Sequence, residues 1–119
     1  MTLTVESGRD APRECRRHLR VLHGYLGSSY DDVALVVTEL VTNSVRHSGT
    51  SDSIDVEVAI DEQVRIEVSD RGQGFQPGGT DGRDPLGLGL GIVDRLASEW
   101  GVTRSDRFTV WAQIPVGTG

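Results

Sequence analysis

The stretch Val36–Ser48, VVTELVTNSVRHS, carries the pattern that decides the fold. Its apolar residues, with Val33 just before it, recur at a period close to 3.6, which predicts one face of an amphipathic helix. Glu39 and Asn43 interrupt this run four positions apart, so they project from the same side of the helix, one turn apart. They can be a solvated helix edge. Alternatively, the carboxylate can polarise a hydroxyl group while the amide oxygen binds Mg²⁺, which prefers oxygen ligands.

The flanking sequence predicts further elements around this helix, which extends over residues 28–49. A strand is expected at 3–7 and a helix at 10–27. Alternation of apolar and polar residues over 53–60 and 63–70 predicts a hairpin with one apolar face. A helix over 92–101 and a strand over 107–116 complete the order. This order predicts a single α+β domain over 1–119, a two-layer sandwich with helices on one face of a mixed, mostly antiparallel sheet.

The composition excludes several classes of function. The formal net charge of −6 argues against direct binding to nucleic acid or to an anionic membrane. The sequence has neither a membrane-spanning apolar segment nor a signal peptide pattern, so a cytoplasmic location is expected. All 12 basic residues are arginine, which excludes a P-loop and a lysine general base. The only cysteine, Cys15, cannot form an internal disulfide and falls in an apolar helix register.

Four arginines lie close together on the first predicted helix, at Arg13, Arg16, Arg17 and Arg20. Because charged residues usually occupy the polar side of an amphipathic helix, they are interpreted as a solvated helix face. The net negative charge of the chain still allows a local basic surface at this place.

A glycine-rich segment from Arg71 to Gly91 holds eight of the 15 glycines, and a loop of this length in a small domain is usually functional. Asp70 precedes it, at the end of a predicted strand. A carboxylate there can accept a hydrogen bond from an exocyclic amine, and Gly72 and Gly74 allow the backbone to approach a flat ring. An ordinary strand-to-loop turn is the alternative interpretation.

The same segment ends in PLGLGLGI, where Gly87, Gly89 and Gly91 lead into a predicted helix. Backbone N–H groups at such a helix start can hold phosphates. The spacing Gly-x-Gly-x-Gly after a loop differs from the dinucleotide fingerprint Gly-x-Gly-x-x-Gly after a strand, so a Rossmann site is excluded.

Together these motifs, in this order, resemble the GHKL or Bergerat ATP-binding fold of gyrase B, Hsp90, histidine-kinase catalytic domains and MutL. The chain length and the closing segment DRLASEWGV…FTVWAQIP look like the anti-sigma factor serine kinases of the RsbW and SpoIIAB type. The resemblance covers nearly the whole chain. One departure is that Arg107 and Phe108 stand where this family often has Gly-Gly or Gly-Lys, which implies a differently shaped adenine end.

The resemblance implies a role for each matching residue. Glu39 would be the general base that activates the attacking hydroxyl, and Asn43 would be the ligand of Mg²⁺. Asp70 would accept a hydrogen bond from the adenine amino group of ATP, supported by Thr109. The remaining assignments place Arg46 and His47 near the phosphates, Gly72 and Gly74 beside the adenine, and Gly87, Gly89 and Gly91 at the phosphate-binding end of an ATP lid spanning about 71–91.

The roles of two residues stay open at the level of sequence. His47 can equally be a cation that faces the C-terminal end of the helix dipole. Arg83, the one arginine of the segment QPGGTDGRDP before the glycine box, is a candidate for contact with the γ-phosphate, and its role stays open.

The resemblance further implies a protein serine kinase that uses ATP and Mg²⁺, phosphorylates a STAS-domain anti-sigma antagonist and sequesters a sigma factor. It also allows a homodimer. The alternative is a non-catalytic binding module that sequesters a regulatory partner, with nucleotide only setting its conformation. These two hypotheses predict the same fold and differ in whether Glu39 acts as a base.

Overall fold

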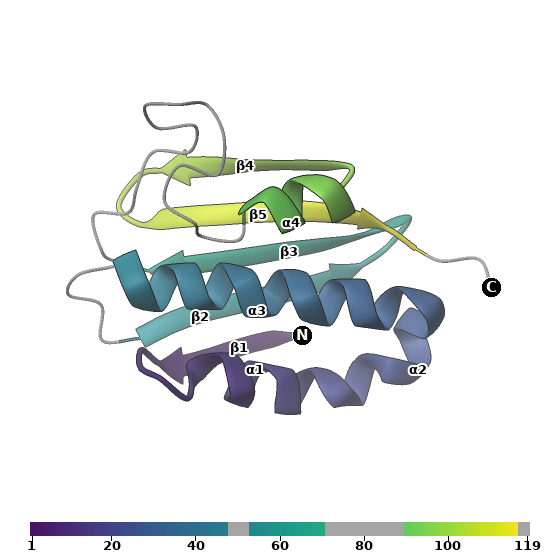
Figure 1. The fold of residues 1–119 in the computed structure, drawn as a ribbon, viewed down its shortest axis with the longest axis horizontal. Helices are drawn as coiled ribbons and strands as arrows, with labels where there is room; N and C mark the ends of the chain where they lie inside the picture. The colour runs from purple at the N-terminus through teal and green to yellow at the C-terminus, as the bar shows by residue number, and fades with distance from the viewer. Residues whose placement is uncertain (48–52, 71–89, 117–119) are drawn as a thin grey trace.

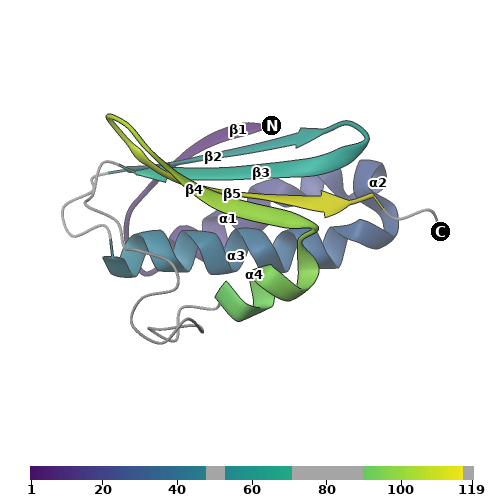
Figure 2. The same ribbon diagram turned by 90° about the horizontal axis from the view of Figure 1, so that it is seen from above.

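The computed structural model describes residues 1–47, 53–70 and 90–116. A five-stranded sheet has the order β1-β2-β3-β5-β4, and every strand pair in the described ranges is antiparallel. The helices cover one face of this sheet (Figure 2). The strands are β1 (Thr2–Glu6), β2 (Ser53–Ile60), β3 (Gln63–Asp70), β4 (Glu99–Arg104) and β5 (Phe108–Pro115). The helices are α1 (Ala11–Leu19), η1 (Arg20–Leu22), α2 (His23–Leu26), η2 (Gly27–Ser29), α3 (Tyr30–His47) and α4 (Leu90–Leu96).

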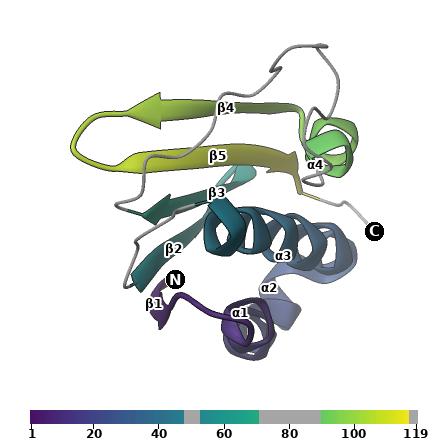
Figure 3. The ribbon, with the colours of Figure 1, turned by 60° about the vertical axis from the view of Figure 1, so that its left-hand side comes forward.

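The core lies between the sheet and the helix layer, and α3 runs across its middle with α1 and α4 on either side (Figure 3). Alternate residues of β2, β3 and β5 face the helices, as the period of two predicts. The largest fully buried side chains include Leu19, Leu40, Ile54, Ile66 and Ile114. The predicted α+β sandwich is therefore confirmed, and the 18-residue α3 is its central helix.

Three sequence-based expectations need correction. The predicted helix over 92–101 is wrong at its end, because α4 stops at Leu96 and Glu99–Arg104 forms strand β4. Trp100 favours a strand and Gly101 disfavours a helix, and pairing with β5 outweighs the helical spacing upstream. The first helix is also shorter than predicted, since 3₁₀ turns interrupt it after Leu19. The sheet was expected to be mixed, whereas its described pairs are all antiparallel.

On the face of the sheet away from the helices, Gly101 lies directly under the indole of Trp111. A Cβ atom at Gly101 would come within 2.8 Å of the Trp111 ring. Above the same ring, the Arg65 guanidinium carbon lies 4.5 Å from the ring centroid. Glycine at position 101 thus allows the Trp111 ring to pack directly against the backbone of β4. None of the helices in the described ranges is long and apolar enough to cross a lipid bilayer.

Cys15 is fully buried in the core, and this burial, reinforced by the negative charge of Glu14, raises the pKa of its thiol from 9.0 to about 11. Between these two pH values the folded chain holds a proton that the unfolded chain has lost. The free energy of unfolding should therefore fall as the pH rises from about 9 to about 11, by roughly 2 kcal/mol. Urea unfolding of wild type and Cys15→Ala across this range measures the difference. Parallel curves for the two proteins would contradict the expectation, because the proteins differ only in the thiol.

Candidate functional site

Asn43 is the most unusual residue of α3, because its amide side chain is buried without a hydrogen-bond partner. It is 1% exposed, and neither Oδ1 nor Nδ2 contacts a donor or acceptor within the described part of the chain. A buried, unpaired amide is destabilising, and native proteins contain few of them. The burial excludes the interpretation of Asn43 as a solvated helix edge. It leaves both polar atoms of the amide without a hydrogen bond in the described part of the chain.

Glu39 lies one turn before Asn43 on the same helix and is only partly buried. Its carboxylate is therefore accessible from solvent while its helix is held rigidly by the valines and leucines on the core side. The i, i+4 spacing places the carboxylate and the amide as neighbours along one side of α3. The structure thus brings together the two residues that the central motif singled out.

Asp70 ends β3 and is 2% exposed, and it meets α3 through Ser44. The Ser44 hydroxyl donates a hydrogen bond to Oδ2 of Asp70. The C-terminal ends of α3 and β3 lie at the same end of the molecule (Figure 1). Asn43, Ser44 and Asp70 are therefore three buried polar residues at one end of the apolar core, and we call this place the polar end of α3.

Sequence reasoning missed Ser44, although one signal was present. Its spacing from Leu40 and Val41 places it on the buried face of α3, where a hydroxyl needs a partner. Only the packing of α3 on β3 identifies that partner as Asp70, 26 residues later in the sequence.

The strand register places Phe108, and not Thr109, beside Asp70 on the helix-facing side of the sheet. Phe108 is 5% exposed. Thr109 pairs with Ser69 across the strands, and their hydroxyl oxygens lie 2.7 Å apart. Since successive side chains point to opposite faces of a strand, the Thr109 hydroxyl faces away from the polar end of α3. Arg107 lies on that outer face as well, in an ion pair with Asp55.

The remaining predicted site residues are described only in part. Gly72, Gly74, Gly87, Gly89 and Arg83 lie outside the described residues, together with most of the predicted lid. Arg46 is exposed near the end of α3, and His47 is the last residue of that helix. Gly91 is the second residue of α4 and is exposed, so the predicted helix after the glycine box is confirmed, with its start at Leu90.

The donor set at the polar end of α3 fits a magnesium ion that is shared with a phosphate ligand. In the described ranges no group of three or more His, Cys, Asp or Glu side chains could hold a metal ion by itself. Mg²⁺ commonly binds through one or two protein oxygens plus phosphates and water. The unpaired Oδ1 of Asn43 is an oxygen of this kind, so the residues present fit the ion.

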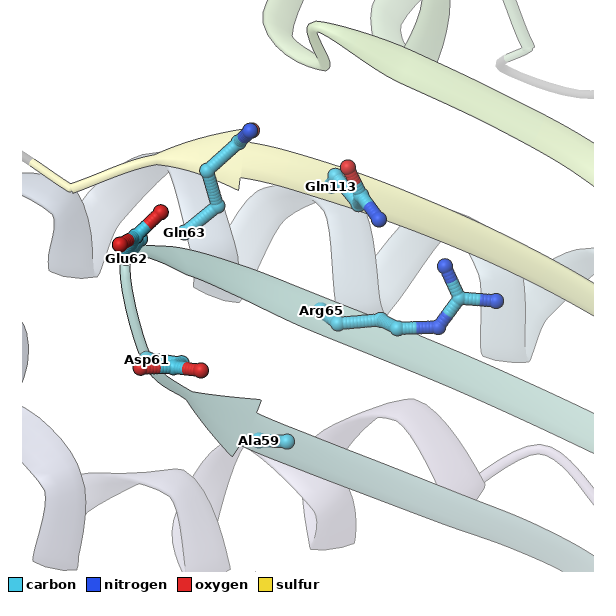
Figure 4. Close-up of a pocket in the computed structure, with 6 residues that line it drawn as sticks. All are labelled: Ala59, Asp61, Glu62, Gln63, Arg65 and Gln113. Carbon is cyan, nitrogen blue, oxygen red and sulfur yellow. The ribbon is translucent and has the colours of Figure 1, made fainter.

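A separate hollow of about 330 Å³ lies at the other end of the sheet, around the turn between β2 and β3 (Figure 4). It is lined by Ala59, Asp61, Glu62, Gln63, Arg65 and Gln113. Gln63 and Asp70 are the two ends of β3, about 23 Å apart at 3.3 Å per residue. This hollow is therefore distinct from the polar end of α3.

Ser44→Ala should reduce stability by about 1–2 kcal/mol, because the buried Asp70 loses a hydrogen-bond donor. If Ser44 also orients Asp70 toward a ligand, the same change should weaken nucleotide binding by about tenfold. Urea unfolding and calorimetric titration with ATP measure the two effects. Ser44→Thr keeps the hydroxyl and should restore the affinity. A normal ATP affinity in Ser44→Ala would show that this hydrogen bond is only structural.

The sequence of this chain matches a known protein family. The family model described as histidine kinase-like ATPase domain matches residues 1–114. No match was found among curated protein sequences.

Solved structures with a similar fold include the RsbU and RsbW domains of a Mycobacterium tuberculosis protein, with 23% identity and a TM-score of 0.68 over 98% of this chain. Another is the histidine kinase domain of a blue-light activated histidine kinase from Erythrobacter litoralis EL346, with 20% identity and a TM-score of 0.58 over 88% of this chain. This chain spans 32% of the first protein chain and 64% of the second. At these identities the likeness concerns the fold.

Proposed function

Because the chain belongs to the histidine kinase-like ATPase domain family, we propose that it is an ATP-binding regulatory protein with protein serine kinase activity. The proposed substrate is a STAS-domain anti-sigma antagonist, and the proposed second partner is a sigma factor that the protein sequesters in the cytoplasm. The match over residues 1–114 supports the ATP-binding part. The RsbW domain in one structural neighbour makes an anti-sigma role the natural hypothesis for the partners.

The observation that carries the proposal is the buried, unpaired amide of Asn43, one turn from Glu39 and next in sequence to the Ser44–Asp70 hydrogen bond. A domain without a ligand would gain stability from an apolar side chain at this position. A bound magnesium–nucleotide complex gives the amide oxygen a partner. The cost of burying Asn43 is then offset whenever the ligand is present.

In the proposed mechanism Asp70 and Asn43 bind the nucleotide and its metal ion, and Glu39 transfers a proton. Asp70, held by Ser44, would accept a hydrogen bond from the adenine amino group. Asn43 would hold Mg²⁺, whose positive charge neutralises the phosphate oxygens when it is bound. Glu39 would take the proton from the attacking serine hydroxyl. This division uses groups at the polar end of α3 and the neighbouring turn of the same helix.

The other family positions are proposed to complete the nucleotide site. Arg46 and His47 would lie near the phosphates, and Gly72, Gly74, Gly87, Gly89 and Gly91 would allow the backbone to approach the nucleotide. Thr109 would act indirectly, because its hydroxyl contacts Ser69, the neighbour of Asp70, on the outer face of the sheet.

Two measurements test the proposal. Saturating Mg·ATP should raise the free energy of unfolding by about 2.7 kcal/mol at a ligand concentration of 100 times Kd, because ATP binds only the folded state. Incubation with γ-labelled ATP, Mg²⁺ and a STAS-domain protein encoded next to this chain should label a serine of that protein. Stabilisation without labelling would favour the non-catalytic binding module. The absence of stabilisation would contradict both functions.

A further inference from the structure

Four arginines of α1 and η1 line a hollow against α3, at the end of the helix layer away from the polar end of α3. The hollow has a volume of about 360 Å³, and its lining consists of Arg13, Arg16, Arg17, Arg20, Tyr30 and Ala34. All four arginines are exposed, and Tyr30 and Ala34 are partly buried. Helices α1 and α3 run side by side in Figures 1 and 3. We call this surface the arginine groove.

The charges of the arginine groove are almost unneutralised. Arg13, Arg16 and Arg20 form no ion pair within the part of the chain that the structure describes, and Arg17 approaches Glu14 only to 3.9 Å. Like charges spaced three and four residues apart on one helix repel each other. The chain has 18 acidic residues, more than its 12 arginines, yet within the described ranges three of these four arginines have no ion pair. Such an arrangement is expected of a surface whose anionic partner comes from outside the chain.

The arginine groove is separate from the proposed nucleotide site. Ala34 precedes Asn43 by nine positions on α3, which corresponds to about 13 Å along the helix axis. The part of the arginine groove on α3 is therefore separated from Asn43, and we look for the function of its four arginines in a second ligand.

The charge of the whole chain indicates what kind of anion fits. The net charge is −6, so the chain without these four arginines carries −10. An extended polyanion such as DNA, or an anionic membrane, would reach beyond the groove and meet this negative surface. A short acidic segment can stay within it. Guanidinium groups bind carboxylates through paired hydrogen bonds, and the small side chain of Ala34 allows a partner to approach α3 closely.

We propose that the arginine groove is a docking surface for an acidic helical segment of a partner protein, with glutamate or aspartate side chains at helical spacing. The four arginines follow one side of this helical segment at i, i+3, i+4 and i+7 (Arg13, Arg16, Arg17 and Arg20), so they can face carboxylates at helical spacing on a neighbouring helix. This inference does not depend on the proposed kinase function, because it requires neither nucleotide nor Glu39.

The experiment uses a labelled helical peptide of about four turns with glutamates at i, i+4 and i+7, and a second peptide with glutamines at those positions. Fluorescence anisotropy measures the binding of both to the full chain without nucleotide, at about 50 and 200 mM salt. We expect the glutamate peptide to bind at least about tenfold more tightly than the glutamine peptide, with lower affinity at high salt.

The variant Arg16→Gln/Arg20→Gln should weaken this binding by at least about fivefold. The matched control is Arg95→Glu on α4, because both changes take the net charge from −6 to −8. The control should stay within about twofold of wild type. Thermal unfolding checks that both variants are folded, which is expected because none of the three arginines has an ion pair in the described ranges.

Three outcomes would overturn the proposal. The first is equal loss of binding in the control, which would show a general charge effect. The second is no preference for glutamate at low salt. The third is tighter binding to a short DNA duplex or to phosphatidylserine vesicles than to the peptide, with the same dependence on Arg16 and Arg20, which would assign the groove to a different class of partner.

Discussion

Replacing Glu39 with glutamine should lower phosphoryl transfer to a partner serine by about 10²–10⁴-fold while ATP binding stays within about twofold of wild type. Glutamine has nearly the same shape as glutamate but cannot accept the proton of the attacking hydroxyl. Glu39 is partly exposed on α3, so the change leaves no cavity in the core. Single-turnover transfer from γ-labelled ATP measures the chemical step, and calorimetric titration measures the affinity.

The matched control is Glu57→Gln, which makes the same chemical change at an exposed position of β2 on the sheet face away from the helices. It should transfer phosphate at the wild-type rate. If Glu39→Gln also transfers at that rate, Glu39 is not the base. If the wild type itself transfers none but binds Mg·ATP, the non-catalytic binding module is the better description of this chain.

Replacing Asn43 with leucine should increase the stability of the ligand-free protein by about 1–3 kcal/mol, because it removes a buried amide that has no hydrogen-bond partner in the described structure. Leucine has the same number and branching of side-chain heavy atoms as asparagine, and its methyl groups add apolar contacts in the helix layer. The same variant should lose the stabilisation by Mg·ATP that the wild type shows, about 2.7 kcal/mol at 100 times Kd. Urea unfolding with and without Mg·ATP measures both effects in one experiment.

Thr42→Val is the matched control, since Thr42 is the neighbour of Asn43 on α3 and is partly exposed. It should respond to Mg·ATP as the wild type does. A destabilised Asn43→Leu protein would mean that the amide has a structural partner. An unchanged response to Mg·ATP in Asn43→Leu would remove Asn43 from the nucleotide site.

Much of the fold could be predicted because its strongest signals are local. The period of 3.6 in α3 and the alternation in β2 and β3 depend on residues that are close in sequence, and these elements are found where they were expected. The predicted end of the helix over 92–101 was wrong because the structure of this segment depends on residues that are distant in sequence. Glu99–Arg104 becomes a strand through pairing with β5, and such pairing outweighs weak local preferences.

The candidate site shows the same division. Spacing alone identified Glu39 and Asn43 as neighbours on one helix face, and the position of Asp70 at a strand end. It could not show that Asn43 is buried without a partner, that Ser44 donates to Asp70, or that Phe108 rather than Thr109 lies beside Asp70. A shift of one residue in strand register moves every side chain to the other face, and nothing within β5 itself specifies its register against β3.

The sequence by itself therefore determined the elements and their order except for β4, and which residues share a face, because these depend on the periodicity of a helix or a strand. Only the tertiary structure decided which of those faces are buried, which residues meet across the layers, and which charges lack a partner. The arginine groove illustrates this point. The sequence showed four arginines on a helix, but the hollow that they form with Tyr30 and Ala34, and the lack of an ion pair for three of them in the described ranges, depend on the packing of α1 against α3.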